Sequence, residues 1–308
     1  MRVVVVGLGV QGRKRTAIAG DEVVATVDPA LPDALYRRIE DVPLGAYDAA
    51  LLCVPDAPKV ELLTYLLGNG KHALVEKPLL SDREGDLAAL AALAAKAGAV
   101  CYTAYNHRFE PHFVRMRDLI QSGRLGQIYT VRMFYGNGTA AQVKASPWRD
   151  TGAGVLFDLG SHLLDTLAFW LGPVTQPFEI MSASRFENRA FDHVTFGAKG
   201  RPLLQLETSL LSWRNHFYVD VHAEKGSAHI TSLCKWGPST FTVRGRVLPS
   251  GRPDEEAVTV VQPDPTWALE YDHFKSLCRD GGSSLNTDLW ISRTLHALSA
   301  AALSSEAP

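Results

Sequence analysis

A glycine-rich turn at residues 7–12, GLGVQG, constrains the fold of this chain more than any other feature. It follows directly after Val3–Val6, four β-branched residues in a row, which are typical of a parallel strand buried on both faces. A helix-compatible run at 13–19 comes next, and then a second strand at 22–27. Strand, glycine turn, helix and strand in this order predict a βαβ unit whose turn opens the helix.

The spacing of the three glycines suits the pyrophosphate of a dinucleotide. Gly7 permits the tight turn, Gly9 lets the backbone approach the phosphates, and Gly12 allows the helix to lie close to the strand. The amino terminus of the helix adds N–H donors and a partial positive charge. These features predict a dinucleotide site at the start of the chain.

Asp28 stands about 20 residues further on, at the position of a ribose-binding carboxylate. Such a carboxylate accepts hydrogen bonds from the ribose hydroxyls and repels a 2′-phosphate, so we expect NAD rather than NADP. The cations at 13–15 favour NADP weakly. We interpret them as a solvated helix face.

A second signal is the end of the strand at 72–76, where the residues Glu76-Lys77-Pro78 follow an apolar run. Proline cannot donate to a sheet ladder, so it closes the strand, and it favours extended backbone at the residue before it. Lys77 is therefore expected at the carboxyl end of the strand, where open α/β sheets bind their ligands.

The remaining patterns predict two domains. Helices are expected at 32–39, 58–67 and 79–97 and strands at 48–54 and 100–104, which makes 1–105 a doubly wound parallel sheet that binds the dinucleotide. Residues 106–308 are expected to form an α+β domain for substrate binding and oligomerisation. Helices are predicted there at 110–122, 152–171, 267–278 and 288–304, and strand-like runs at 127–135 and between 178 and 261 predict a large, mostly antiparallel sheet.

The helix that begins after Gly152-Ala153-Gly154 carries Asp158 and His162, four residues apart and so on one helix face. An imidazole titrates near neutrality and suits proton transfer to or from a hydroxyl group. We interpret His162 as the base, Asp158 as its partner or as a ligand of a substrate hydroxyl, and Lys77 as the group that polarises the reacting oxygen. Whether Lys77 or His162 carries the proton stays open.

Together, the glycine turn, Cys-Val-Pro at 53–55, Glu-Lys-Pro at 76–78, Asn-His-Arg-Phe at 106–109 and the segment at 152–162 resemble the Gfo/Idh/MocA oxidoreductases. The resemblance implies a Rossmann domain joined to an α+β domain with a large, mostly antiparallel sheet. It also implies an NAD(P)-dependent dehydrogenase or reductase acting on a hydroxyl or keto carbon of a sugar, polyol or sugar nucleotide. A homodimer or homotetramer, formed through the outer face of the antiparallel sheet, is implied as well. The chain departs from the family pattern in the short segment after Asp28 and in Ala153, which replaces a glycine.

Site residues follow from the motifs and the resemblance. The catalytic candidates are Lys77, Asp158 and His162. The cofactor-binding candidates are Gly7, Gly9, Val10, Gln11, Gly12, Asp28, Val54, Pro55, Glu76 and Lys77. The substrate-binding candidates are Asn106, Arg108, Tyr135, Trp148 and Arg149, and His107 is expected to line the cleft. Arg149 suits a carboxylate or phosphate and Trp148 a sugar face, which hints at a uronic acid or a nucleotide sugar.

Composition excludes several classes of protein. Net charge is −2 with no basic run, so we expect no nucleic-acid or anionic-lipid partner. The sequence shows no apolar stretch near the roughly 20 residues of a membrane span, no metal-binding spacing of His and Cys, and four scattered cysteines, all of which favour a metal-free cytoplasmic protein. Two alternatives stay open: a reductase of a non-sugar such as a dihydrodiol or an imine, and a non-catalytic dinucleotide sensor.

Overall fold

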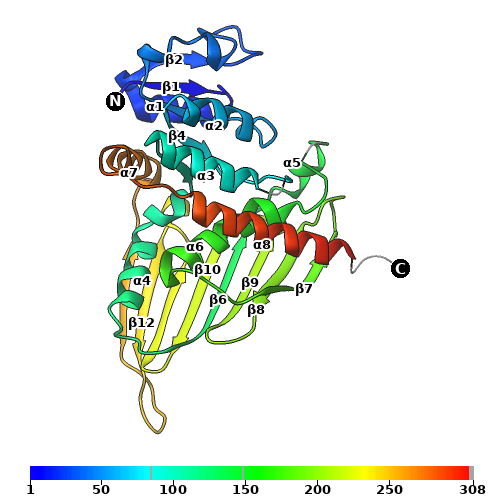
Figure 1. Ribbon diagram of the computed structural model, residues 1–308. Coiled ribbons are helices and arrows are strands. Elements are labelled where there is room, and N and C mark those ends of the chain that lie inside the picture. Colours follow the sequence, from blue (N-terminus) through cyan, green and yellow to red (C-terminus); the bar gives the residue numbers. More distant parts are fainter. Residues whose placement is uncertain (84, 148, 305–308) are drawn as a thin grey trace. The chain divides into compact units, whose positions relative to one another are not determined.

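A computed structural model describes residues 1–83, 85–147 and 149–304, so the candidate residue Trp148 lies outside the described residues. The chain divides into two units (Figure 1). The first comprises Met1–Asn106 and Thr266–Ser292, and the second comprises His107–Pro265 and the residues from Arg293 onward. The first unit therefore includes Thr266–Ser292, a segment that the sequence pattern assigned to the second domain.

A five-stranded parallel sheet forms the centre of the first unit, in the order β2-β1-β3-β4-β5. Its strands are β1 (Val3–Val6), β2 (Val23–Val27), β3 (Ala49–Leu52), β4 (His72–Glu76) and β5 (Cys101–Ala104). The helices between them are α1 (Val10–Ala19), α2 (Lys59–Gly68) and α3 (Asp86–Ala97). Every residue of β1 is buried, as its unbroken run of valines predicts. The expectation of a doubly wound Rossmann sheet is confirmed.

The far end of the chain completes the core of this unit. Helix α7 (Thr266–Asp280) packs Tyr271 and Phe274 against the sheet face that carries Val3 and Val5. Helix α8 (Leu285–Ser304) begins with Leu285, which is buried in the core on the other face. Both faces of the parallel sheet are thus covered partly by residues distant in sequence.

Two helix predictions in this unit were wrong in whole or in part. Residues 32–39 form turns, because Tyr36 pairs with the end of β2: its N–H donates to the Thr26 carbonyl and its carbonyl accepts from Asp28. The helix expected from residue 79 begins only at Asp86. Ser81 accepts a hydrogen bond from the Arg83 N–H and donates one to Asp86, and such local side-chain bonds compete with helix formation.

The second unit contains an eight-stranded sheet in the order β13-β12-β11-β10-β6-β9-β8-β7 (Figure 1). Its strands are β6 (Ile128–Gly136), β7 (Phe178–Ser184), β8 (His193–Ala198), β9 (Leu203–Ser209), β10 (His216–Ala223), β11 (Gly226–Thr231), β12 (Ser239–Gly245) and β13 (Glu255–Val260). β6 and β9 run parallel, and the other neighbouring pairs are antiparallel. A large, mostly antiparallel sheet was expected, and it is confirmed.

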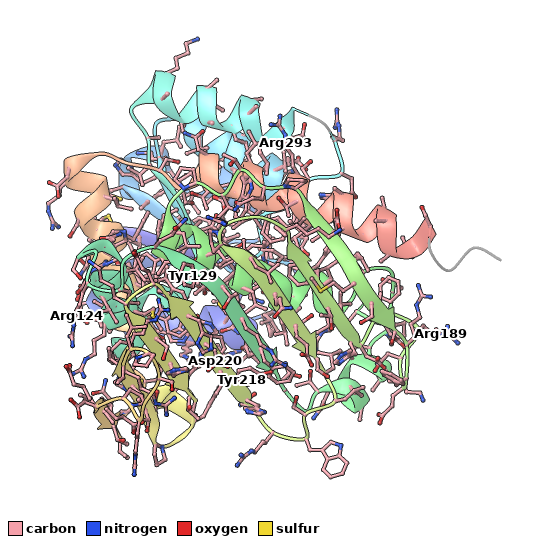
Figure 2. The ribbon with its side chains drawn as sticks, turned by 90° about the horizontal axis from the view of Figure 1, so that it is seen from below. Arg124, Tyr129, Arg189, Tyr218, Asp220 and Arg293 are labelled. Carbon is pink, nitrogen blue, oxygen red and sulfur yellow. The ribbon has the colours of Figure 1, made fainter. Side chains whose placement is uncertain are left out.

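Helices cover one face of this sheet (Figure 1). They include α4 (Pro111–Gln121) and α6 (Ser161–Leu171), which follows a π-helical turn at Leu156–Gly160. The short helix α5 (Ala140–Lys144) follows β6 in the chain. In β10 the odd-numbered positions are buried, whereas Tyr218 and Asp220 lie on the opposite face (Figure 2). No helix within the described ranges is long and apolar enough to span a membrane. Those ranges also hold no group of three or more His, Cys, Asp and Glu side chains that could hold a metal ion.

Candidate active site

The glycines at 7–12 differ in what they do for the fold. Gly7 has φ +86°, and a Cβ added there would lie 2.4 Å from the Cys53 carbonyl oxygen. A Cβ on Gly12 would lie 1.8 Å from the Gly7 carbonyl oxygen, whereas one on Gly9 would meet nothing within 4 Å. Gly7 and Gly12 are therefore required by the backbone itself. Gly9 instead leaves open space beside the first turn of α1, where Val10 and Gln11 are exposed.

Asp28, directly after β2, ties the glycine loop to the neighbouring strand. Its carboxylate accepts the N–H of Leu8 at 2.9 Å, of Ala30 at 2.9 Å and of Leu31 at 3.0 Å. Burial raises the pKa of Asp28, but the three N–H bonds lower it by more, so the pKa lies below its ordinary value. Asp28 is thus an ionised group that keeps lone-pair capacity for a further donor.

Arg37 adds a cation beside Asp28 that the sequence pattern did not single out. Its guanidinium donates to the backbone carbonyls of Asp28 and Leu31. Arg37 lies in the segment 32–39, for which the sequence pattern predicted a helix. That pattern therefore could not predict that Arg37 lies beside Asp28.

Glu76 is engaged by a buried arginine of α1. Arg15 donates from Nε to Glu76 at 2.8 Å, and its Nη2 lies 2.6 Å from Glu270 of α7. Burial opposes the charge of Arg15, but the two carboxylates more than compensate and raise its pKa. This arrangement fixes the end of β4 relative to the helix that follows the glycine loop.

A buried lysine, Lys59, holds the turn that carries Lys77. From the first turn of α2 its ammonium group donates to the Pro78 carbonyl at 2.7 Å and to Asp56 at 2.6 Å. Burial lowers the pKa of Lys59. No motif distinguished Lys59 in the sequence, since a lysine in the first turn of a helix is ordinary.

Most of the cofactor-side candidates follow the carboxyl ends of β1, β2, β3 and β4, which lie at one edge of a parallel sheet. Val54 and Pro55 follow β3, and Lys77 follows β4. Asn106, at the end of the first segment of this unit, donates from Nδ2 to Thr266 Oγ1 at 2.8 Å. Its amide is thus committed to holding the start of α7.

In the second unit, five side chains from four parts of the chain form what we term the imidazole cluster: His107, Tyr135, His162, Lys235 and Trp236. The rings of His107 and His162 are stacked, with 4.2 Å between centroids and 22° between planes. The Tyr135 ring lies 5.3 Å from His107 and 5.7 Å from His162. Lys235 Nζ lies 3.2 Å from His107 Nε2, and the Trp236 ring lies 5.8 Å from that of Tyr135.

Sequence reasoning missed Lys235 and Trp236. They lie in a short 3-10 turn at Cys234–Trp236, between strands, and no local pattern connects that turn with His162. Tyr135 and His162, both expected near the site, do come together with His107.

Asp158 lies in the π-helical turn that precedes α6. Burial raises the pKa of Tyr135, and the negative charges of Asp158 and Glu110 raise it further. Arg149 Nη2 lies 4.0 Å from Asp158 Oδ2, and both side chains are partly exposed. Regular α-helical spacing does not apply between Asp158 and His162, because the π turn changes the rotation per residue; such turns frequently occur at functional sites.

Arg108 forms a two-point ion pair with Asp165, at 2.8 Å from Nε and 2.6 Å from Nη2. Burial raises the pKa of the Asp165 carboxyl, and Arg108 partly offsets this effect. The pair joins the 3-10 turn at Asn106–Phe109 to α6, and so helps to hold His107 against His162.

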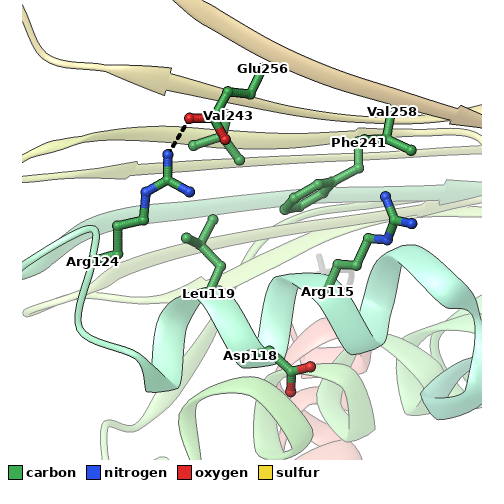
Figure 3. Close-up of a pocket in the computed structure, with 8 residues that line it drawn as sticks. All are labelled: Arg115, Asp118, Leu119, Arg124, Phe241, Val243, Glu256 and Val258. Atoms are coloured by element: carbon green, nitrogen blue, oxygen red, sulfur yellow. Dashed lines mark hydrogen bonds and ion pairs between the residues drawn. The ribbon is translucent and has the colours of Figure 1, made fainter.

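The second unit also has a hollow of about 280 Å³ between α4 and strands β12 and β13 (Figure 3). Leu119 and Phe241 point into it, and Arg124 pairs with Glu256 at its rim (Figure 3). Its lining residues are Arg115, Asp118, Leu119, Arg124, Phe241, Val243, Glu256 and Val258, none of which belongs to the imidazole cluster.

Two family models match the chain, one to each part. Residues 1–105 match the oxidoreductase family with an NAD-binding Rossmann fold, and residues 113–229 match the Gfo/Idh/MocA C-terminal domain. The chain belongs to the Gfo/Idh/MocA family. The resemblance stated from the motifs is therefore confirmed, and with it the NAD-binding Rossmann domain.

Named relatives agree with this assignment. The chain is 28% identical over 157 residues to inositol 2-dehydrogenase of Rhizobium meliloti (strain 1021), covering 48% of this chain and 46% of the relative. It is 30% identical over 140 residues to the scyllo-inositol 2-dehydrogenase (NADP(+)) IolW of Bacillus subtilis (strain 168), covering 44% of this chain and 38% of the relative. The matched stretches thus span less than half the length of these curated relatives.

Solved structures show the same fold over nearly the whole chain. Levoglucosan dehydrogenase, in complex with NADH and levoglucosan, is similar with a TM-score of 0.82 at 16% identity, covering 99% of this chain and 97% of that one. An NAD-binding oxidoreductase from Klebsiella pneumoniae is similar with a TM-score of 0.82 at 17% identity, with the same coverage.

Proposed function

We propose that this protein is an NAD-dependent dehydrogenase or ketoreductase that acts on a hydroxyl or keto carbon of a sugar, polyol or sugar nucleotide. The observation that carries the proposal is the imidazole cluster, in which His162 is held by stacked and edge-on rings. A protein that only sensed a dinucleotide would not need an imidazole held in this way. Named relatives that act on inositols support the substrate class.

On the cofactor side, Gly7, Gly9 and Gly12 would receive the pyrophosphate and Asp28 the ribose hydroxyls. Val10, Gln11, Val54, Pro55 and Glu76 complete this proposed set. Bound NAD would supply the hydride acceptor. The ionised carboxylate of Asp28 supports NAD, whereas Arg37 beside it and, more weakly, the cations at 13–15 favour a 2′-phosphate.

On the substrate side, His162 would take the hydroxyl proton as hydride leaves the same carbon, and would return it in the reverse direction. Lys77 would donate a hydrogen bond to the reacting oxygen and stabilise its developing charge. Asp158, with Arg149 nearby, would bind a neighbouring hydroxyl of the substrate.

The other substrate candidates divide into two groups. Tyr135 and Trp148 are proposed to contact the sugar. Asn106 and Arg108 have partners, Thr266 and Asp165, which support a role in holding the site together. We assign residues 1–105 to dinucleotide binding and 106–308 to substrate binding and oligomerisation, except that Thr266–Ser292 serves to complete the first unit.

A second copy of the chain is the proposed partner, through the open face of the eight-stranded sheet (Figure 2). Arg132 lies over the Tyr218 ring at 5.8 Å on this face, and Asp220 bonds His229 at 2.6 Å. Aromatic side chains and arginine are enriched at protein interfaces. The four cysteines are free, which supports a reducing, cytoplasmic environment.

The test is a titration of the protein with NADH and NADPH, followed by turnover assays with the dinucleotide that binds more tightly. The panel comprises inositols, aldoses, uronic acids and UDP-sugars, with a dihydrodiol and a cyclic imine as non-sugar substrates. We expect tighter binding of NADH and turnover of a polyhydroxylated substrate. Failure to bind either dinucleotide, or turnover of the non-sugars alone, would contradict the proposal.

A further inference from the structure

The contact between Lys235 and His107 determines where the proton of His107 resides. A lysine ammonium group has three donors and no acceptor, so the Nε2 atom that it approaches at 3.2 Å must be the acceptor. The ring proton of His107 therefore lies on Nδ1, and the ring is neutral. Nε2 of His107 is thereby occupied and cannot serve as a base.

His107 is held firmly in this state. Its side chain is buried, and the Phe113 and Phe217 rings pack against it edge to face, with 5.8 Å and 6.3 Å between ring centroids. Protonating it would break the bond from Lys235 and place a second positive charge against an ammonium group. Because His107 is thereby excluded as a base, the proton exchange assigned above to this cluster falls to His162.

We propose that Lys235 is a positioning residue that acts through His107, so that His162 is the ring of the stacked pair that exchanges the substrate proton. This inference rests on the proposed function and deepens it, because it explains how two adjacent histidines are given different roles. The groups around the pair are Asp158 in the π turn, Tyr135 on β6, and the ion pair of Arg108 with Asp165.

Two acids, Glu110 and Asp264, belong to the electrostatic surroundings of the turn that carries Lys235. Glu110, which accepts the Cys234 N–H at 3.1 Å, is buried, and its burial raises the pKa of its carboxyl. Lys235 and Asp264 both act electrostatically on Glu110.

The experiment compares Lys235→Met, Lys235→Arg and, as control, Lys225→Met at an exposed turn between β10 and β11. The first readout is the ring ¹⁵N spectrum of histidine-labelled protein, which reports the tautomer of each imidazole without requiring turnover. The second is kcat and KM against pH with the preferred dinucleotide and substrate. Thermal unfolding of each variant confirms that it is folded.

We expect Lys235→Met to lose the fixed Nδ1–H form of His107 and to lower kcat roughly 10-fold to 100-fold, with the KM for the dinucleotide unchanged. Removing a positive charge makes protonation of His162 easier, so the acid limb of the kcat/KM profile should move up by about 0.5 to 1 pH unit. Lys235→Arg should recover most of both effects, and Lys225→Met should behave as the wild type.

A Lys235→Met protein with the wild-type histidine spectrum, kcat and pH profile would overturn the inference. Should Lys235→Met fail to fold, Lys235→Arg decides alone: the fixed His107 tautomer with near-wild-type kcat supports the inference, and loss of either overturns it. If the wild type binds a dinucleotide but turns over no substrate, the proposed function fails, while the spectra still test the bond from Lys235. If His162→Asn abolishes turnover and Lys235→Met changes nothing, the function stands and only this inference fails.

Discussion

Arg15 and Glu270 form a buried ion pair, with 2.6 Å between Nη2 and Oε2 and at most 1% of either side chain exposed. Arg15 belongs to α1, which begins in the glycine loop, and Glu270 belongs to α7 near the other end of the chain. Since Glu270 and Glu76 together more than compensate for the burial of Arg15, α7 is an integral part of the unit that holds the glycine loop.

Arg15→Met should destabilise the protein by about 3–5 kcal/mol, because it leaves Glu270 buried without its cation. Urea unfolding of the full chain measures the change in free energy. Arg13→Met is the matched control: its partner Asp33 and Arg13 itself are exposed, so the loss should be about 0–1 kcal/mol. Equal losses for the two variants would show that burial of the Arg15 pair is energetically unimportant.

Gly12→Ala and Gly9→Ala should separate folding from cofactor binding. A methyl group on Gly12 collides with the backbone at 1.8 Å, so that variant should lose stability as well as dinucleotide affinity. Gly9 has open space around it, so Gly9→Ala should unfold like the wild type yet bind NADH at least about tenfold more weakly. Unchanged NADH affinity in a folded Gly9→Ala protein would show that the phosphates of the dinucleotide do not bind at this loop.

Local signals explain which features were predictable. The valine run and glycine spacing define β1, its turn and α1 because each depends on residues that are adjacent in sequence. The pairing of Tyr36 with the end of β2 overrode a helical pattern, because tertiary hydrogen bonds compete with local propensity. For the site, the motifs singled out His162, but its stacking on His107 and the bond from Lys235 to His107 arise where the 3-10 turn at Asn106–Phe109, α6 and a turn between strands meet. These three segments are far apart in the sequence, so residue spacing could not predict that they come into contact.

Asp28→Ser should shift cofactor preference towards the phosphorylated dinucleotide. The substitution removes the negative charge that repels a 2′-phosphate, while Arg37 stays beside the site. We expect weaker NADH binding and the ratio of NADPH to NADH affinity to rise by about tenfold or more. Fluorescence titration with both dinucleotides measures the ratio. An unchanged ratio would show that Asp28 does not contact the ribose.

His162→Asn should reduce kcat by about 10²–10⁴-fold and leave the Kd for NADH nearly unchanged, because it removes the proton carrier without altering the glycine loop. Steady-state kinetics and a separate NADH titration give the two quantities. His216→Asn, at an exposed position of β10, serves as the control. Normal turnover in His162→Asn would show that another group carries the proton, and Lys77 would be the next candidate.

Acid should weaken the first unit through His72. The Val100 N–H donates to His72 Nδ1 at 2.9 Å, and partial burial lowers the pKa of this imidazole below its ordinary value. Since the unfolded chain binds the proton first, the contribution of His72 is complete above about pH 6.5 and is lost as the pH falls through the folded pKa. Urea unfolding at about pH 7.5 and about pH 5.5 should show a smaller difference for His72→Asn than for the wild type. Equal differences in the two proteins would exclude His72 as a contributor.

The return of Thr266–Ser292 to the first unit has a consequence for how the chain is made. During synthesis the five parallel strands leave the ribosome early, but the carboxylate that completes the surroundings of Arg15 and the side chains Tyr271 and Phe274 emerge only after the whole eight-stranded sheet. The core of the first unit therefore stays partly uncovered during synthesis until the strands of the second unit have been translated. Translation of α7 thus sets the earliest moment at which the glycine loop can become a finished binding site.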